Sequence, residues 1–217
     1  MPVQPRIRAR TRWAGVPADE RRAGRRELLL DAAFELLGTE GWSATTVRAV
    51  CTQAQLNFRY FYESFADLDE LLVALYDRLV AELGEQVLAA MDATGDDPAA
   101  RLRAAIDRIL AYVADDARRG RVLYVEALGS EPLNRRRLDT THAVVVAVEE
   151  QGAKARGGVG DDGVGRIAAA ILVGGLTELV VAWLDGRIDL PRERLVDDAT
   201  ELFIGLGAAA SGIAARR

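Results

Sequence analysis

The run Asn57-Phe58-Arg59-Tyr60 gathers four side chains that can make directed contacts with a large partner. An arginine guanidinium pairs well with guanine, and an asparagine amide pairs with adenine. Phe58 is suited either to a thymine methyl group or to core packing, and Tyr60 combines an aromatic ring with a hydroxyl. This combination favours the recognition of base edges in nucleic acid.

Two short helices are expected to position this run. Apolar side chains of the first helix fall on one face, and a three-residue break follows it before Asn57, which is a favourable N-cap. Two short helices joined by such a break describe a helix-turn-helix, whose second helix fits the major groove of DNA. The expected bounds are Thr45 or Thr46 to Gln53 for the first helix and Asn57 to Tyr62 for the second.

The rest of the chain shows helical periodicity and no convincing strand alternation. We therefore expect an all-α fold of about nine helices. It consists of an N-terminal three-helix helix-turn-helix head and a C-terminal helical body. The other expected helices cover about residues 19–39, 67–93, 98–116, 121–128, 133–150, 166–185 and 191 to beyond 206.

Residues 25–75 resemble the DNA-binding head of the tetracycline-repressor-like (TetR) regulators. The most specific feature is the spacing of Tyr62, Phe65 and Leu71. The resemblance also rests on the runs 28–33 (LLLDAA), 41–42 (GW) and 45–50 (TTVRAV), and on Ala54 and Leu72. Four positions depart from the family pattern. Gln55 replaces the turn glycine, and Asn57 replaces the usual serine cap with the same capping chemistry. Ser64 replaces a histidine, and Leu68 replaces a lysine that reaches a phosphate.

The resemblance implies roles for several residues of the head. Thr46 and Tyr62 would bind phosphates, while Arg48, Asn57, Arg59 and Tyr60 would face base edges. Both tyrosines could instead serve packing. The full expected DNA-binding set is Thr45, Thr46, Arg48, Asn57, Phe58, Arg59, Tyr60 and Tyr62.

The charge is unevenly distributed along the chain. The net charge is −5, but residues 1–65 hold ten arginines and seven acidic residues, a net of +3. The remainder therefore carries −8, as expected for a head that meets nucleic acid and a body that does not. The arm of residues 1–18 contributes Arg6, Arg8, Arg10 and Arg12, which either follow DNA or form a solvated tail. The α-helix that follows adds Arg21, Arg22, Arg25 and Arg26, which either face solvent or contact DNA.

Other classes of function find little support. The single cysteine, Cys51, is expected to be a small buried residue, and one histidine leaves little for acid–base catalysis. Residues 158–163 match the glycine pattern of dinucleotide sites, but no strand precedes them and two aspartates would repel a pyrophosphate. We therefore expect no enzymatic activity, no metal and no cofactor.

The body, residues 67–217, is expected to bind a small molecule and to form a homodimer, with 19–66 as the DNA-binding domain. Residues 167–184 are almost entirely apolar, but Glu178 argues against a membrane span, so a helix buried nearly all round by protein is expected. The expected function is an operator-binding repressor in the cytoplasm, released by a ligand; the alternative is an activator or a ligand-independent regulator. Pocket candidates are Tyr124, His142, Thr177, Glu178 and Trp183, although Glu178 could instead bond across the dimer interface.

Overall fold

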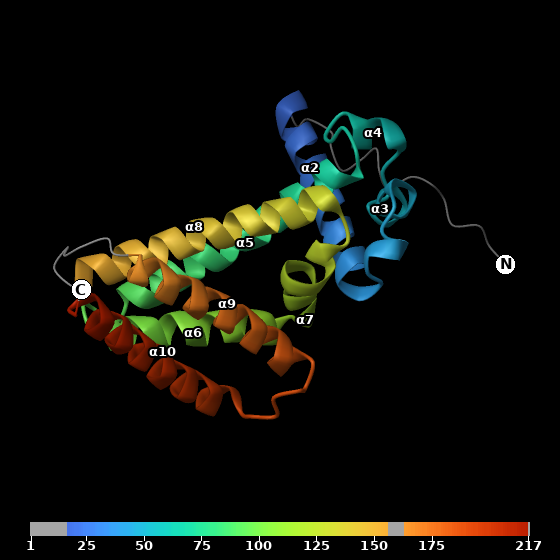
Figure 1. Ribbon diagram of the computed structural model, residues 1–217. Helices are drawn as coiled ribbons and strands as arrows, with labels where there is room; N and C mark the ends of the chain where they lie inside the picture. The colour runs from blue at the N-terminus through green and yellow to red at the C-terminus, as the bar shows by residue number, and fades with distance from the viewer. Residues whose placement is uncertain (1–16, 156–162, 217) are drawn as a thin grey trace. The chain divides into compact units, whose positions relative to one another are not determined.

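The structure is a computed structural model that describes residues 17–155 and 163–216. Within these residues it contains nine α-helices and no strand, which confirms the all-α expectation (Figure 1). The chain divides into two compact units, Met1–Tyr76 and Asp77–Arg217. The division lies inside a long helix, α5 (Leu68–Asp92), rather than before it.

The first unit contains α2 (Ala18–Thr39), a 3₁₀ turn η1 (Trp42–Ala44), α3 (Val47–Gln53), α4 (Phe58–Tyr62) and the first turns of α5. Its core is built from leucines of α2 and α5 around Val50 and Phe61, all shielded from solvent. This explains why α5 contributes to both units: Leu71, Leu72 and Leu75 belong to the core of the head.

The connection between α2 and α3 is held by Gly41 and Thr45. Gly41 has a φ of 86° and a ψ of −175°, a conformation that glycine adopts without steric cost. The Thr45 side chain is only 3% exposed, and its hydroxyl donates to the Gly41 carbonyl at 2.9 Å. Thr45 is therefore a structural residue of this turn.

The helix α5 begins as its sequence indicated. The Asp67 carboxylate accepts a hydrogen bond from the Glu70 backbone N–H at 2.8 Å. The Glu70 carboxylate reaches back to the N–H of Ala66 rather than to that of Asp67. The two side chains thus satisfy backbone donors that have no partner within the helix.

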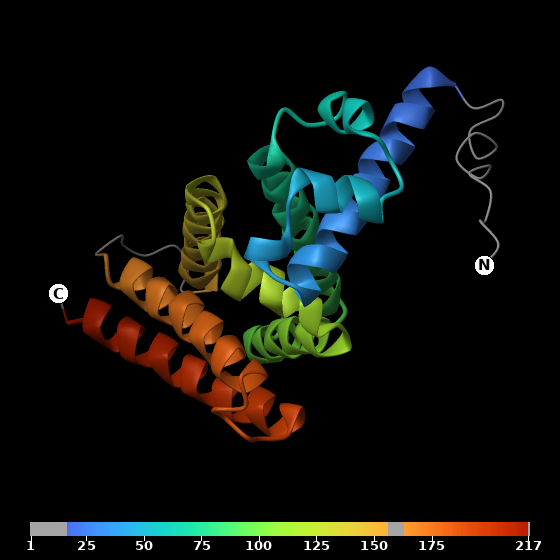
Figure 2. The same ribbon diagram turned by 90° about the vertical axis from the view of Figure 1, so that its right-hand side faces the viewer.

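The second unit holds α6 (Pro98–Asp115), α7 (Ala117–Gly120), α8 (Glu131–Ala155), α9 (Val164–Leu184) and α10 (Arg192–Ala214). Helix α9 packs against α8 and α10, and α10 also packs against α6. The close course of α9 and α10 is visible in Figure 2. The helix expected at residues 121–128 is instead a π-helical turn, η2 (Arg121–Val125), followed by a 3₁₀ turn, η3 (Glu126–Leu128).

Tyr112 on α6 is the largest fully buried side chain of the body. Its hydroxyl lies 3.1 Å from a Glu82 carboxylate oxygen and 3.4 Å from the Leu79 carbonyl, both on α5. Burial, together with the negative charge of Glu82, raises the pKa of Tyr112 far above its ordinary value. The hydroxyl therefore remains a donor at any ordinary pH and joins α6 to α5.

Helix α9 does not have the environment that its sequence suggested. In its most apolar 18-residue window only 17% of the residues are buried, so the expectation of a helix enclosed by its own chain is wrong. Beyond the exposed Arg166 in the first turn, the exposed residues recur at helical spacing and form one stripe, hereafter the α9 stripe: Ile167, Ala170, Ile171, Gly174, Gly175 and Glu178. Length and composition alone would also allow this helix to span a membrane.

Candidate nucleic-acid interface

The helix-turn-helix forms with the bounds that the sequence indicated. The Thr46 hydroxyl accepts the N–H of Ala49 at 3.1 Å and begins α3, and the Asn57 side chain accepts the N–H of Tyr60 at 3.1 Å and begins α4. Both residues are exposed. Because the cap occupies the Asn57 carbonyl oxygen, only the amide nitrogen remains for a base, and bidentate pairing with adenine would compete with the cap.

Helix α4 is anchored by one residue and presents the others. Phe61 is completely buried and lies edge-on to Tyr62, with ring centroids 5.3 Å apart. Tyr62 is nevertheless 60% exposed, and Phe58 is also exposed. The exposure of Phe58 argues against core packing, and Tyr62 presents most of its ring and hydroxyl to solvent.

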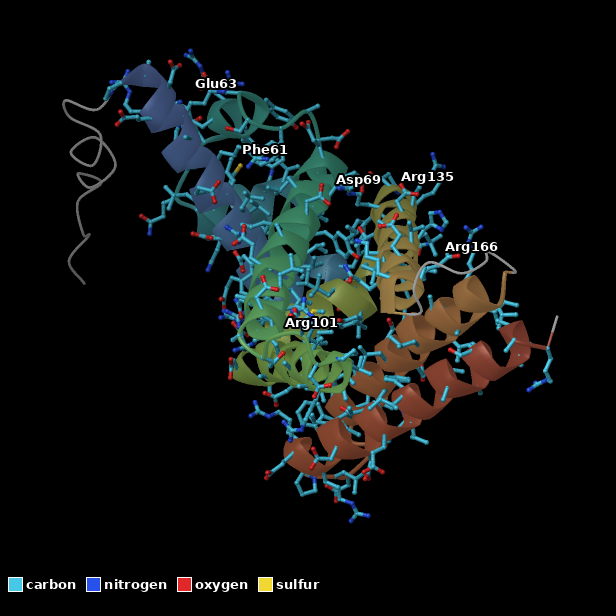
Figure 3. The ribbon with its side chains drawn as sticks, turned by 90° about the vertical axis from the view of Figure 1, so that its left-hand side faces the viewer. Phe61, Glu63, Asp69, Arg101, Arg135 and Arg166 are labelled. Carbon is cyan, nitrogen blue, oxygen red and sulfur yellow. The ribbon has the colours of Figure 1, made fainter. Side chains whose placement is uncertain are left out.

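Arg59 is the one charged residue of α4, and 82% of its side chain is accessible. Its Nε atom donates to a Glu63 carboxylate oxygen at 2.9 Å. Glu63 also lies 3.4 Å from Arg25 of α2. Figure 3 shows Glu63 beside the end of α4, next to α2. The sequence reasoning missed Glu63, although its position four residues after Arg59 was a visible signal.

The arginines of α2 are not all a solvent face. Arg25 is only 13% exposed, stacks on the Tyr60 ring at 4.5 Å from the centroid, and fixes that half-buried ring from one side. Arg22 donates to the Glu63 carbonyl at 2.6 Å, and Arg26 lies over the Phe65 ring at 4.9 Å. These side chains join α2 to the end of α4 and to the turn that follows it.

The remaining expected contact residues divide by exposure. Arg48 is exposed on α3, one residue beyond the first residue of that helix, beside the exposed Thr46. The Thr45 side chain is buried and donates to the Gly41 carbonyl, so its position does not fit a direct side-chain contact with DNA. The expected burial of Cys51 is confirmed at 4% exposure, and burial raises the pKa of its thiol.

The described part of the head is not basic. Residues 17–65 carry six arginines and seven acidic residues, so the positive excess comes from Arg6, Arg8, Arg10 and Arg12. These four lie outside the described residues, and so does most of the 158–163 glycine run. Gly163 alone of that run is described, as the left-handed N-cap of α9 with a φ of 77°.

The five pocket candidates lie on three elements and differ in exposure. His142 on α8 is exposed, and Glu178 on α9 is 72% exposed with Arg187 at 3.8 Å, so neither fits an enclosed pocket. Trp183 donates from its indole nitrogen to the Leu190 carbonyl at 3.0 Å and so fastens the turn between α9 and α10. Thr177 donates to the Val173 carbonyl within its own helix. Tyr124 is half-buried in the π-helical turn, a kind of distortion frequent at functional sites.

Comparison with known proteins assigns this head. Residues 29–75 match the family of bacterial regulatory proteins of the tetR type. The head is thus of the TetR type. The matched segment begins in α2 and ends in α5, and therefore contains the complete helix-turn-helix.

Similar proteins agree with this assignment. The HTH-type transcriptional regulator BetI of Stenotrophomonas maltophilia is 35% identical over 83 residues, which are 38% of this chain and 42% of that protein. The match therefore spans less than half the length of this curated relative. Two solved structures share the fold across both units. The fatty acid degradation regulator FadR of Bacillus halodurans has a TM-score of 0.70 at 18% identity, over 83% of this chain and 95% of its own. A TetR-like transcriptional regulator from Rhodococcus has a TM-score of 0.64 at 22% identity, over 88% and 97%.

Proposed function

We propose that this protein is a TetR-family transcriptional repressor that binds a specific double-stranded DNA operator through α3 and α4. The observation that carries the proposal is the construction of α4. Phe61 fixes the helix to the core of the head, whereas Phe58, Arg59 and Tyr62 project from it into solvent. A short, rigidly held helix with exposed polar and aromatic side chains is what the major groove admits.

The exposed residues divide into two kinds of contact. Thr46 and Tyr62 offer hydroxyls to phosphates, which position the head without reading the sequence. Arg48 and Arg59 offer guanidinium groups to guanine, and Asn57 offers an amide donor to a base. Tyr60 reaches DNA only with the part of its ring that Arg25 does not cover, and Phe58 offers an apolar surface to a thymine methyl group.

We propose that the protein is a homodimer joined through α9 and α10. The α9 stripe is mostly apolar and contains two glycines that allow a close helix approach. On α10, Leu202 is 73% exposed, and Ile204, Gly205, Ala208 and Ala209 are exposed with it. Large exposed apolar patches on soluble proteins mark association sites. A dimer would place two heads on half-sites about one helical turn, roughly 34–36 Å, apart.

The proposed regulation is release from the operator by a small molecule bound in the body, among Tyr124 and its neighbours. Such a ligand acts only through a difference in its affinity for the DNA-binding state and the released state. The proposal places the protein in the cytoplasm and includes no enzymatic step, metal or cofactor. An activator, or a regulator without a ligand, would use the same head and the same dimer.

Selection from a randomised double-stranded DNA library, followed by titration at several salt concentrations, tests the proposal. We expect an enriched palindromic site whose affinity falls steeply with salt, because phosphate contacts release counterions. Arg59→Ala should lose preference at one base pair of each half-site, whereas Tyr62→Phe should weaken all sequences alike. Failure to enrich any sequence would refute the proposed function.

A further inference from the structure

Glu63 is the point at which three arginines of the head meet. Its carboxylate accepts a hydrogen bond from Arg59 Nε at 2.9 Å and lies 3.4 Å from Arg25. Its backbone carbonyl accepts a hydrogen bond from Arg22 at 2.6 Å. An acidic residue this close to the exposed surface of α4 is unfavourable for binding a polyanion. The proposed contacts with bases and phosphates do not account for an acidic residue at this position.

The Arg59–Glu63 contact leaves the recognition edge of the guanidinium available. The Glu63 carboxylate accepts its hydrogen bond from Nε of Arg59. Among the described residues, no acceptor is bonded to either terminal nitrogen, and the side chain is 82% exposed. These two terminal nitrogens form a pair that can donate together to O6 and N7 of guanine.

Glu63 is itself held in place. Arg25 is 13% exposed, and the Tyr60 ring covers its guanidinium at 4.5 Å, so the charge next to Glu63 cannot swing away freely. The bond from Arg22 fixes the backbone of Glu63 rather than its side chain. A chain of contacts thus runs from α2 through Arg25 and Glu63 to Arg59.

Stability is a poor explanation for this arrangement. Exposed ion pairs four residues apart on a helix contribute little to folding, because solvent screens the charges and two long side chains lose freedom. Ordering a guanidinium before it meets its partner, in contrast, removes part of the entropy cost of binding.

We propose that Glu63 is a positioning residue that orients Arg59 for bidentate contact with guanine and so sets the base preference of α4. The inference rests on the proposed DNA-binding function and identifies one determinant of its specificity. A correctly placed bidentate pair discriminates between bases by roughly 5- to 150-fold. Without the carboxylate, Arg59 samples many orientations and meets phosphate as readily as guanine.

The experiment compares the full chain with Glu63→Ala and Glu63→Gln in selection from a randomised double-stranded DNA library, with affinities then measured for the selected site and for a scrambled site. We expect Glu63→Ala to lose at least about 5-fold of the preference at the base pair that Arg59→Ala also affects. Affinity for the scrambled site should stay equal or rise, because a negative charge has been removed. Glu63→Gln keeps a carbonyl acceptor for Arg59 Nε, so its base preference should lie between that of the wild type and that of Glu63→Ala.

A matched control and a double variant separate the possible roles. Glu40→Ala removes one exposed acidic residue of the head without touching Arg59 and should keep the base preference. Glu63→Ala should add no further loss at that base pair in an Arg59→Ala background, because its effect passes through Arg59.

Three outcomes would overturn the inference. Equal loss of affinity for selected and scrambled sites would show that Glu63 only supports the fold. A gain in affinity with unchanged base preference would show that Glu63 merely restrains Arg59 from DNA, and an unchanged preference with unchanged affinity would show that it has no part in recognition. If the wild-type chain enriches no sequence, the proposed function fails instead, independently of the Glu63 variants.

Discussion

Gln55 lies in the turn of the helix-turn-helix with a backbone φ of 55°, the one positive φ at a non-glycine residue among the described parts of the chain. Helix α3 ends there in a Schellman motif: Leu56 N–H bonds to the Cys51 carbonyl at 2.9 Å, and Gln55 N–H bonds to the Thr52 carbonyl at 3.1 Å. The motif requires a left-handed residue at this position, and the Gln55 side chain is exposed. We therefore expect Gln55→Gly to stabilise the head.

The magnitude follows from two opposing terms. The left-handed conformation costs a residue with a Cβ atom roughly 1–2 kcal/mol. Glycine avoids this cost but loses roughly 0.5–1 kcal/mol more conformational freedom on folding. No side-chain contact is given up, because the glutamine is exposed. The net gain is therefore about 0.5–1 kcal/mol.

Cys51 supplies the assay. It is the only cysteine of the chain, it lies in α3 itself, and it is 4% exposed. Burial also raises its thiol pKa, so a thiol reagent reacts appreciably only when the head opens. When closing is faster than labelling, the rate follows the opening equilibrium. Gln55→Gly should then slow labelling about 2- to 5-fold.

Two controls isolate the cause. Gln55→Ala keeps the Cβ atom and the strained backbone, so its labelling rate should match that of the wild type. Gln53→Gly introduces glycine two residues earlier, at the exposed last position of α3, and should accelerate labelling about 2- to 5-fold. Equal rates for Gln55→Gly and Gln55→Ala would refute the view that the left-handed turn is strained.

Three further predictions address the arm, the body and the dimer. Deleting residues 1–13 removes four arginines, so affinity should fall for all DNA sequences and the salt dependence should flatten by up to about 3.6 logarithmic units per decade of salt; an unchanged slope would mean that the arm is only a tail. Tyr112→Phe leaves Glu82 without its buried donor and should lower the free energy of unfolding by about 1–3 kcal/mol in urea titrations. Because the raised pKa of Tyr112 favours the neutral hydroxyl in the folded state, stability should also decline above pH 10 in the wild type, and less steeply in the variant. Leu202→Glu should yield a monomer by light scattering at micromolar concentration, whereas Leu138→Glu, an equally drastic change on α8, should leave the assembly unchanged; dimers in both would argue against α10 as the interface.

The head could be predicted closely because its signals are local. Thr46 and Asn57 act as N-caps through bonds that span three residues, so their effect can be recognised without knowledge of the rest of the fold. The sequence does not distinguish Thr45 from the cap beside it, and only the three-dimensional turn at Gly41 shows that the Thr45 hydroxyl points inward.

The contacts within the head and within the body were harder to predict, since they join residues far apart in the sequence. Arg25 and Glu63 are separated by 38 positions, and Tyr112 and Glu82 by 30. Nothing in either local sequence indicates its partner. The π-helical turn at Arg121–Val125 has the composition of an ordinary helix, and its extra residue is visible only in the backbone. His142 was expected in a pocket for its chemistry alone, which does not determine whether a side chain faces inward.

The composition of helix α9 shows that the helix needs an apolar environment, but not which environment it has. An apolar stretch of this length is compatible with a core helix, a membrane span or an interface, and the three differ in which sides of the helix are covered. A core helix is covered all round, whereas only 17% of this window is buried. A membrane span needs an apolar surface facing lipid, but the α9 stripe ends at Glu178, which is 72% exposed and lies 3.8 Å from Arg187. Helix α9 has one side covered by α8 and α10 and a continuous exposed stripe with two adjacent glycines, which supports the proposed packing of this stripe against a second copy of the chain.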